Sequence, residues 1–176
     1  MRLVQIQKLL DDNNIGYIIS HIKNLREYRH KQGFLKANDN IPVLIITIPN
    51  PNHSKNIELI FESDDSNPVF VDMEFGGYWN ELFDCRDEWI ESFLTDEIQN
   101  ILNDKVYVIF ARDEKTGAWF FDANFHDLDD ELLNDMDEFN EYMKRIHSPK
   151  NWLRKLTGRV DRYEIFNWTN YQCIIK

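Results

Sequence analysis

Cysteine and basic residues are both scarce in this sequence, and each scarcity narrows what the protein can be. The two cysteines, Cys85 and Cys173, form neither a CxxC pair nor a spacing typical of zinc ligands. We interpret both as reduced thiols, which favours a cytoplasmic location. Lys and Arg number 20 against 31 Asp and Glu, giving a formal net charge of −11. This charge disfavours nucleic acid or an anionic membrane as a partner, and it favours either a basic protein partner or simply solubility.

Long apolar runs are missing as well. No stretch approaches the roughly 18 apolar residues of a membrane-spanning helix. The N-terminal segment reaches its first acids at Asp11 and Asp12, which does not fit a signal peptide. We therefore expect neither a membrane-spanning segment nor a signal peptide.

Signatures of catalysis and of metal binding are not found in the sequence. The five histidines are scattered and form neither an HxH nor an HExxH spacing. His126 and the acids that follow it, up to Asp130, lack the order of acids and glycine that an EF-hand loop requires. No nucleophile motif and no phosphate-binding loop is present. The sequence therefore predicts no bound metal, no cofactor and no enzymatic activity.

The most informative stretch that is present covers residues 67–85. Its side chains alternate with a period of two, which predicts a strand with one apolar face and one largely acidic face. The apolar set is Val69, Val71, Met73 and Phe75, and the other set is Phe70, Asp72 and Glu74. Gly76 and Gly77 end this strand, and the large aromatics Tyr78 and Trp79 follow at once.

Periodicity along the rest of the chain predicts a single α+β domain covering residues 1–176. Short connections favour a mainly antiparallel sheet of about five to seven strands, with two amphipathic helices packed on it and further helices at the N-terminus. The predicted helices cover residues 3–33, with a break near 11–14, and residues 84–103 and 129–146. The inner face predicted for the last of these consists of Leu132, Leu133, Met136, Phe139, Met143 and Ile146. The predicted strands cover residues 43–48, 57–61, 69–75, 106–111, 118–122, 162–168 and 171–175. Those at 43–48 and 106–111 are continuously apolar, so we expect them inside the sheet. Those at 162–168 and 171–175 are expected to form a C-terminal hairpin that turns at Thr169-Asn170.

The segment 84–103 is the clearest helix in the sequence. We place all its large apolar residues on one inner stripe and its acids on the other side. That stripe contains Trp89, Ile90, Phe93, Leu94, Ile98, Ile101 and Leu102. Asp84 and Asp87 lie near the start, where the positive end of the helix dipole favours acids.

Charge is distributed unevenly along the chain. Residues 62–104 contain 13 acids and one base, Arg86, and residues 122–141 contain nine acids without Lys or Arg. Residues 144–162 reverse this balance, with seven bases and one acid. The pattern indicates either a solvated acidic face partly neutralised by a basic tail, or an acidic surface that steers a basic protein into contact.

The aromatic pair that follows Gly77 is the best candidate for a binding site, because Tyr and Trp supply large contact areas and the acids around them would meet Arg or Lys of a partner. The predicted partner-binding residues are Asp72, Glu74, Tyr78, Trp79, Glu81 and Asp84. Alternatively, the aromatics belong to the buried core. A catalytic interpretation also stays open, because Asp72 and Glu74 are neighbours on one strand face and paired carboxyls can divide acid and base roles.

A spaced motif runs through residues 41–125. It consists of Phe75-Gly76 at a strand end, Ile98 and Ile101-Leu102-Asn103 in an acidic helix, and Lys105 before the next strand. This pattern resembles small bacterial immunity proteins of polymorphic or contact-dependent toxin systems. The resemblance implies a protein that binds and neutralises a cognate toxin, often a basic nuclease, and it implies no catalytic residues.

Together these observations favour an immunity-type protein that occludes the active site of a basic toxin through an acidic surface, which can mimic nucleic-acid phosphate. Two alternatives remain. One is a small enzyme that uses the Asp72/Glu74 face. The other is a regulatory protein-binding module unrelated to toxins.

Overall fold

The computed structural model describes residues 3–24, 42–62, 70–77, 79–126, 133–148, 158 and 160–176. The chain divides into two compact units, Met1–Gln99 and Asn100–Lys176. Both contain helix and antiparallel sheet, so the α+β class predicted from the sequence is confirmed, with the strands divided between two sheets. Among the described ranges, no helix is long and apolar enough to cross a membrane.

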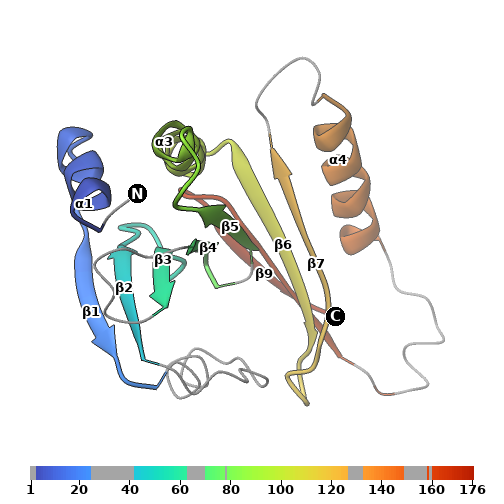
Figure 1. The fold of residues 1–176 in the computed structure, drawn as a ribbon. Helices are drawn as coiled ribbons and strands as arrows, with labels where there is room; N and C mark the ends of the chain where they lie inside the picture. The colour runs from blue at the N-terminus through green and yellow to red at the C-terminus, as the bar shows by residue number, and fades with distance from the viewer. Residues whose placement is uncertain are drawn as a thin grey trace. The chain divides into compact units, whose positions relative to one another are not determined.

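The first unit is built on a five-stranded antiparallel sheet whose strand order follows the order in the chain (Figure 1). The strands are β1 (Ile18–Ile22), β2 (Val43–Ile48), β3 (Ile57–Glu62), β4 (Phe70–Phe75) and β5 (Trp79–Asp84). β2 pairs with β1 on one side and with β3 on the other, and nearly all of its side chains are buried. The prediction that residues 43–48 lie inside the sheet is confirmed.

The helix predicted for residues 15–33 is wrong where the structure describes it, because residues 18–22 form the edge strand β1. Ile18, Ile19 and Ile22 fit a helical stripe, but β-branched side chains also suit a strand, and pairing with β2 decides between the two. Residues 25–33 of the predicted helix lie outside the described residues.

β5 is a strand that sequence analysis did not predict. Gly76 and Gly77 have φ values of 64° and 75°, a left-handed conformation that costs glycine little. They reverse the chain, so residues 79–84 return along β4 in antiparallel register. The following helix therefore begins at Ile90 rather than at Asp84.

The core of the first unit lies between one face of its sheet and two helices, α1 (Leu3–Asp12) and α3 (Ile90–Leu102). In Figure 1, α1 and the start of α3 both lie above the strands of this sheet. Gln5 of α1 donates a hydrogen bond to Glu91 of α3, with 3.2 Å between Nε2 and Oε1. The fully buried residues of this layer include Ile6, Leu10, Leu59, Met73, Leu94 and Ile98.

The second unit has a four-stranded antiparallel sheet in the order β7-β6-β8-β9. Its elements are β6 (Val106–Asp113), β7 (Trp119–His126), α4 (Leu133–His147), β8 (Asp161–Phe166) and β9 (Tyr171–Ile175). β6 lies inside the sheet and β8 pairs with β9, so the interior strand and the C-terminal hairpin predicted from the sequence are confirmed.

The core of the second unit lies between its sheet and α4. Phe139, Met143 and Ile146 of α4 pack against Ile109 and Phe125 of the sheet. These three residues belong to the inner face predicted for this helix, which is confirmed for them. The first residues of the predicted helix, 129–132, lie outside the described residues.

The buried strand β2 provides a direct test of this core. Ile45 is fully buried, so Ile45→Ala should lower the free energy of unfolding by about 2–5 kcal/mol, through lost burial and the cavity that remains. Ile18→Ala is the matched control, because Ile18 is 56% exposed and its truncation should change stability by about 0.5 kcal/mol or less. Urea denaturation measures both, and equal losses would contradict the burial of β2.

Candidate functional site

The pairing of β4 with β5 separates the residues predicted to form one binding surface. Directly paired residues on neighbouring strands share a face of the sheet, and side chains alternate along each strand. Asp72, Glu74 and Asp84 therefore lie on one face. Glu81 pairs with Met73 and lies on the other face. The four acids cannot form a single patch on one side of the sheet.

The predicted site residues also differ in how accessible they are. Glu81 is exposed and Asp84 is partly exposed at the end of β5. Tyr78 and the side chain of Trp79 lie outside the described residues, so their part in binding stays a prediction. Asp72 is half-buried.

Glu74 does not lie on an open acidic face, which corrects the expectation from sequence. Its exposed fraction is 6%, and Glu58, its direct neighbour on β3, is 5% exposed. The strand register places Glu74 on the same face as the buried apolar cluster of Val43, Ile45 and Ile60, so this face is covered rather than open. A catalytic role for the Asp72/Glu74 pair would require a substrate to reach a buried carboxyl.

Asp84 is held by a basic residue of its own chain. Arg86 binds it through two contacts, Nε to Oδ1 at 2.9 Å and Nη2 to Oδ2 at 2.6 Å. The guanidinium also lies over the ring of Phe70, 5.8 Å from its centroid, and Phe70 is the residue directly opposite Asp84 on β4. The hydrogen bond from the Arg86 side chain is the main cause that lowers the pKa of Asp84 to about 2. This acid is therefore charged but already paired.

Trp89 and Phe93 are exposed, contrary to the inner stripe predicted for this helix. Their exposed fractions are 65% and 53%, whereas Ile90, Leu94 and Ile98 are buried as predicted. Residues four apart on a helix are neighbours, so the two rings form one aromatic patch. Glu88, Ser92 and Asp96 are exposed beside them, and we call these five residues (Glu88, Trp89, Ser92, Phe93 and Asp96) the α3 outer face.

The sequence did contain a signal for this face. At 100° per residue, the seven apolar positions assigned to the inner stripe spread over more than half of the helix circumference. A helix packed on one side buries a narrower arc, and Trp89 lies at the margin of that spread. Asp87 then determines where the helix starts, because its Oδ1 accepts a hydrogen bond from the Trp89 backbone N–H at 2.9 Å.

A shallow groove of about 620 Å³ lies between α1 and α3. Its charged lining residues are Lys8, Asp12, Glu91 and Asp96, so acids outnumber bases there as well. Asp96 belongs both to this groove and to the α3 outer face. The accessible side of α3 is therefore acidic on the flank of its aromatic pair that borders this groove.

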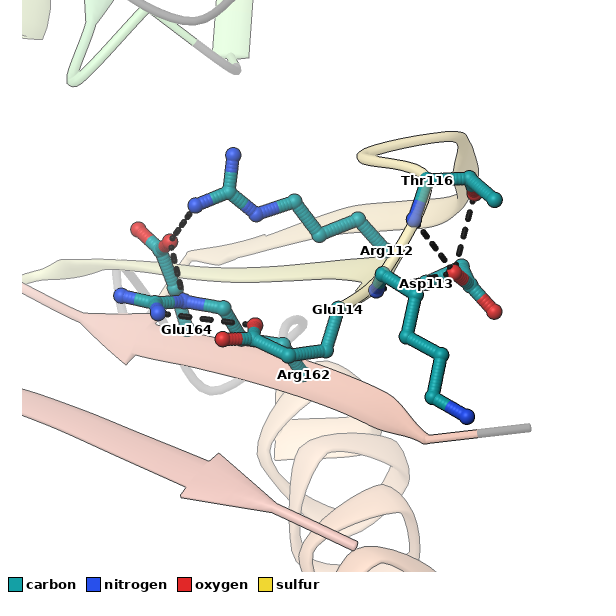
Figure 2. Close-up of polar contacts among 7 residues, drawn as sticks. Arg112, Asp113, Glu114, Thr116, Arg162 and Glu164 are labelled. Carbon is teal, nitrogen blue, oxygen red and sulfur yellow. Dashed lines mark hydrogen bonds and ion pairs between the residues drawn. The ribbon is translucent and has the colours of Figure 1, made fainter. Parts of the chain in front are cut away.

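The second unit contains a polar cluster whose charges are satisfied internally (Figure 2). Arg112 and Arg162 face each other directly on β6 and β8, where like charges repel. Glu164, almost fully buried, accepts hydrogen bonds from both, at 3.2 Å and 3.1 Å, and Glu114 contacts Arg162 at 3.5 Å. Burial lowers the pKa of Arg162, but a hydrogen bond with Tyr171 and nearby negative charges outweigh it, so the pKa is raised. We therefore interpret this cluster as a set of contacts that stabilises the pairing of β6 with β8.

The acidic segment 129–141 and the segment after His126 are two further candidates from the sequence. The acidic helix of the second unit is α4, whose outer side has a hollow of about 630 Å³ that includes Asp137, Glu138 and Glu141. Over the part of the chain that the structure describes, no group of three or more His, Cys, Asp or Glu could hold a metal ion. Residues 127–130 of the His126 segment lie outside that part.

The two cysteines are free, as the sequence predicts. Cys85 is buried immediately after β5, and burial raises the pKa of its thiol, which disfavours the reactive thiolate. Cys173 is exposed on β9.

Comparison with known proteins identifies no relative of this chain: no family model, no curated protein and no solved structure matches it.

The Asp84–Arg86 pair predicts a specific titration. The pKa of Asp84, at about 2, lies below its ordinary value of 3.8, so any stabilisation from the pair is complete above pH 3.8 and is lost as the pH falls through about 2. Arg86→Ala should return this pKa towards 3.8, as measured by NMR titration of the side-chain carboxyl carbon. Arg145→Ala, which removes an exposed arginine from α4, should leave it unchanged.

The buried carboxylate of the second unit predicts a loss of stability. Glu164→Gln should lower the free energy of unfolding by about 3 kcal/mol, because it leaves Arg112 and Arg162 opposed without a buried negative charge. The control is Glu141→Gln, which removes the exposed partner of Arg145 and should cost less than about 1 kcal/mol. Thermal or urea unfolding that ranks the two variants equally would contradict the structural role of Glu164.

Proposed function

We propose that this chain is an immunity-type binding protein, which neutralises a basic toxin by covering its active site and performs no catalysis itself. The observation that carries the proposal is the α3 outer face, where two large aromatic side chains are exposed among acids. Exposed aromatics of this size commonly mark protein-interaction sites, and Trp is among the residues that contribute most to binding energy.

Charge supports a basic partner. The net charge is −11, and the segment 62–104 that contains α3 has 13 acids against one base. That base, Arg86, is already paired with Asp84, so the exposed acids Glu88, Glu91 and Asp96 face the solvent without a nearby base in the same segment. Such a surface accelerates association with a positively charged protein.

The toxin would be neutralised because this protein occupies its active site. A toxin that acts on nucleic acid carries a basic active-site surface, and an acidic protein surface can occupy it in place of phosphate. In this proposal the α3 outer face supplies the apolar anchor, and Glu81, the exposed acid of the predicted site, adds charge from β5. The likeness of residues 41–125 to immunity proteins supports the same function.

The proposal predicts distinct kinetic effects for aromatic and acidic residues. The binding partner for this test is a basic toxin domain, to be sought in the genes next to this one. Against such a domain, Trp89→Ala should speed dissociation and cost roughly 2–4 kcal/mol of binding free energy. Asp96→Lys should mainly slow association, and the difference from wild type should shrink as salt is raised. Surface-immobilised kinetics over a salt series separates the two effects.

A matched control exists in the second unit. Trp119 is 60% exposed on β7, so Trp119→Ala removes the same side chain from a surface of similar exposure and should leave both rates unchanged. Co-expression supplies the functional measurement, because cells that produce the toxin domain should grow with the wild-type protein and stop growing with Trp89→Ala. Growth arrest of cells that produce the wild-type protein would overturn the proposed function. If Trp89→Ala and Trp119→Ala change the binding rates equally, the α3 outer face is excluded as the binding surface.

A further inference from the structure

The single base of the segment 62–104 is bound by the chain itself, and the contacts that hold it form a defined binding arrangement. Asp84 offers both carboxylate oxygens to Arg86, at 2.9 Å and 2.6 Å. The ring of Phe70 lies against the same guanidinium, 5.8 Å away. The ladder between β4 and β5 places these two side chains directly opposite each other.

We propose that Phe70 and Asp84 form an arginine-binding site, which Arg86 occupies in the free protein and which an arginine side chain of a basic partner occupies on docking. The proposal rests on the proposed function for the identity of the natural partner, and it goes further by naming the side chain that is recognised.

The geometry selects arginine over lysine. The planar guanidinium presents two parallel N–H groups that match the two oxygens of a carboxylate, whereas an ammonium group acts as a point charge. A guanidinium can also stack on an aromatic ring while it makes this bidentate contact. Asp84 and Phe70 supply both halves of that recognition, and the strand register holds them together whether or not Arg86 is bound.

Arg86 is suited to being displaced. Its side chain is 70% exposed and that of Asp84 is 38% exposed, and ion pairs this open to solvent are held weakly. The Phe70 ring is itself 43% exposed, so its other surface is accessible. Release of the Arg86 side chain need not unfold the turn, because the Arg86 backbone N–H separately donates to Asp84 Oδ1 at 2.9 Å.

The surroundings favour a ligand from a protein rather than free arginine. Leu82 lies two residues before Asp84, on the same face of the sheet, and is 61% exposed. It therefore offers an apolar contact surface beside the arginine-binding site. Asp87 and Glu88 are exposed along the chain towards Trp89. An arginine that projects from a larger basic surface would therefore find further contacts on both sides.

An external arginine can bind only while the site is free of Arg86. Its apparent affinity is therefore the intrinsic affinity multiplied by the fraction of time that the site is free. Removing Arg86 should therefore strengthen the binding of an external arginine. The probes are a short peptide of alternating arginine and alanine and its lysine counterpart, added to the intact protein. Arg86→Ala should lower the dissociation constant of the arginine peptide by about five- to tenfold, and that of the lysine peptide by less than about twofold.

The control variant removes a comparable arginine elsewhere. Arg145 pairs with Glu141 at 3.3 Å and lies over the ring of Tyr142 at 5.5 Å, but it has only one contact with its carboxylate in place of two. Arg145→Ala makes the same change in net charge and should leave the preference for arginine unchanged. Asp84→Asn keeps an oxygen for the turn, and it should abolish the preference.

NMR locates the effect, because the backbone amide of residue 86 donates to Asp84 and should shift when the arginine peptide binds. If Arg86→Ala strengthens the binding of both peptides equally, or if Arg145→Ala strengthens the binding of the arginine peptide as much as Arg86→Ala does, the effect comes from net charge alone. Either result would overturn the proposal. The peptide measurement is independent of the toxin. If the protein binds the arginine peptide selectively but fails to neutralise the toxin, this inference stands and the proposed function is wrong. If the protein neutralises the toxin but shows no preference for the arginine peptide, the proposed function stands and this inference is wrong.

Discussion

The register between β4 and β5 is the constraint on which the accessible surface of the first unit depends. It places Phe70 opposite Asp84 and Met73 opposite Glu81, so it determines which acids share a face. Because side chains alternate, a slip of one residue would transfer every β5 side chain to the other face. The glycine turn at Gly76 and Gly77 makes this return of the chain possible, since both residues adopt a conformation that most residues avoid. A short turn thus decides which carboxylates share a face of the sheet.

The length of β5 also positions α3. Because residues up to Asp84 pair in the sheet, the helix cannot begin until the chain has turned, and Asp87 then caps it through the Trp89 backbone. This start aligns Ile90, Leu94 and Ile98 with the core and leaves Trp89 and Phe93 outside. The aromatic patch is therefore a consequence of where the preceding strand ends.

The two units differ in how their charged side chains are paired. In the second unit, the charges of Arg112 and Arg162 are balanced by the buried Glu164 and by Glu114, and the resulting cluster joins neighbouring strands. In the first unit, Arg86 is the single base of its segment and offsets a single carboxylate, which leaves the exposed acids Glu81, Asp87, Glu88, Glu91 and Asp96. An internally balanced cluster stabilises a fold, whereas an unbalanced acidic surface that carries exposed aromatics is suited to attracting and holding a basic partner.

The sequence by itself determined the α+β class, the interior strands β2 and β6, the C-terminal hairpin and the inner residues of α4. These features follow from local periodicity and turn chemistry, which the chain carries at short range. Tertiary structure alone decided that residues 18–22 form a strand, that residues 79–84 pair as β5, that Glu74 is buried and that Trp89 and Phe93 are exposed. The physical reason is that strand pairing selected the conformation of residues 18–22 and 79–84, and that packing of the whole unit decides which side chains are buried, which a local pattern does not specify.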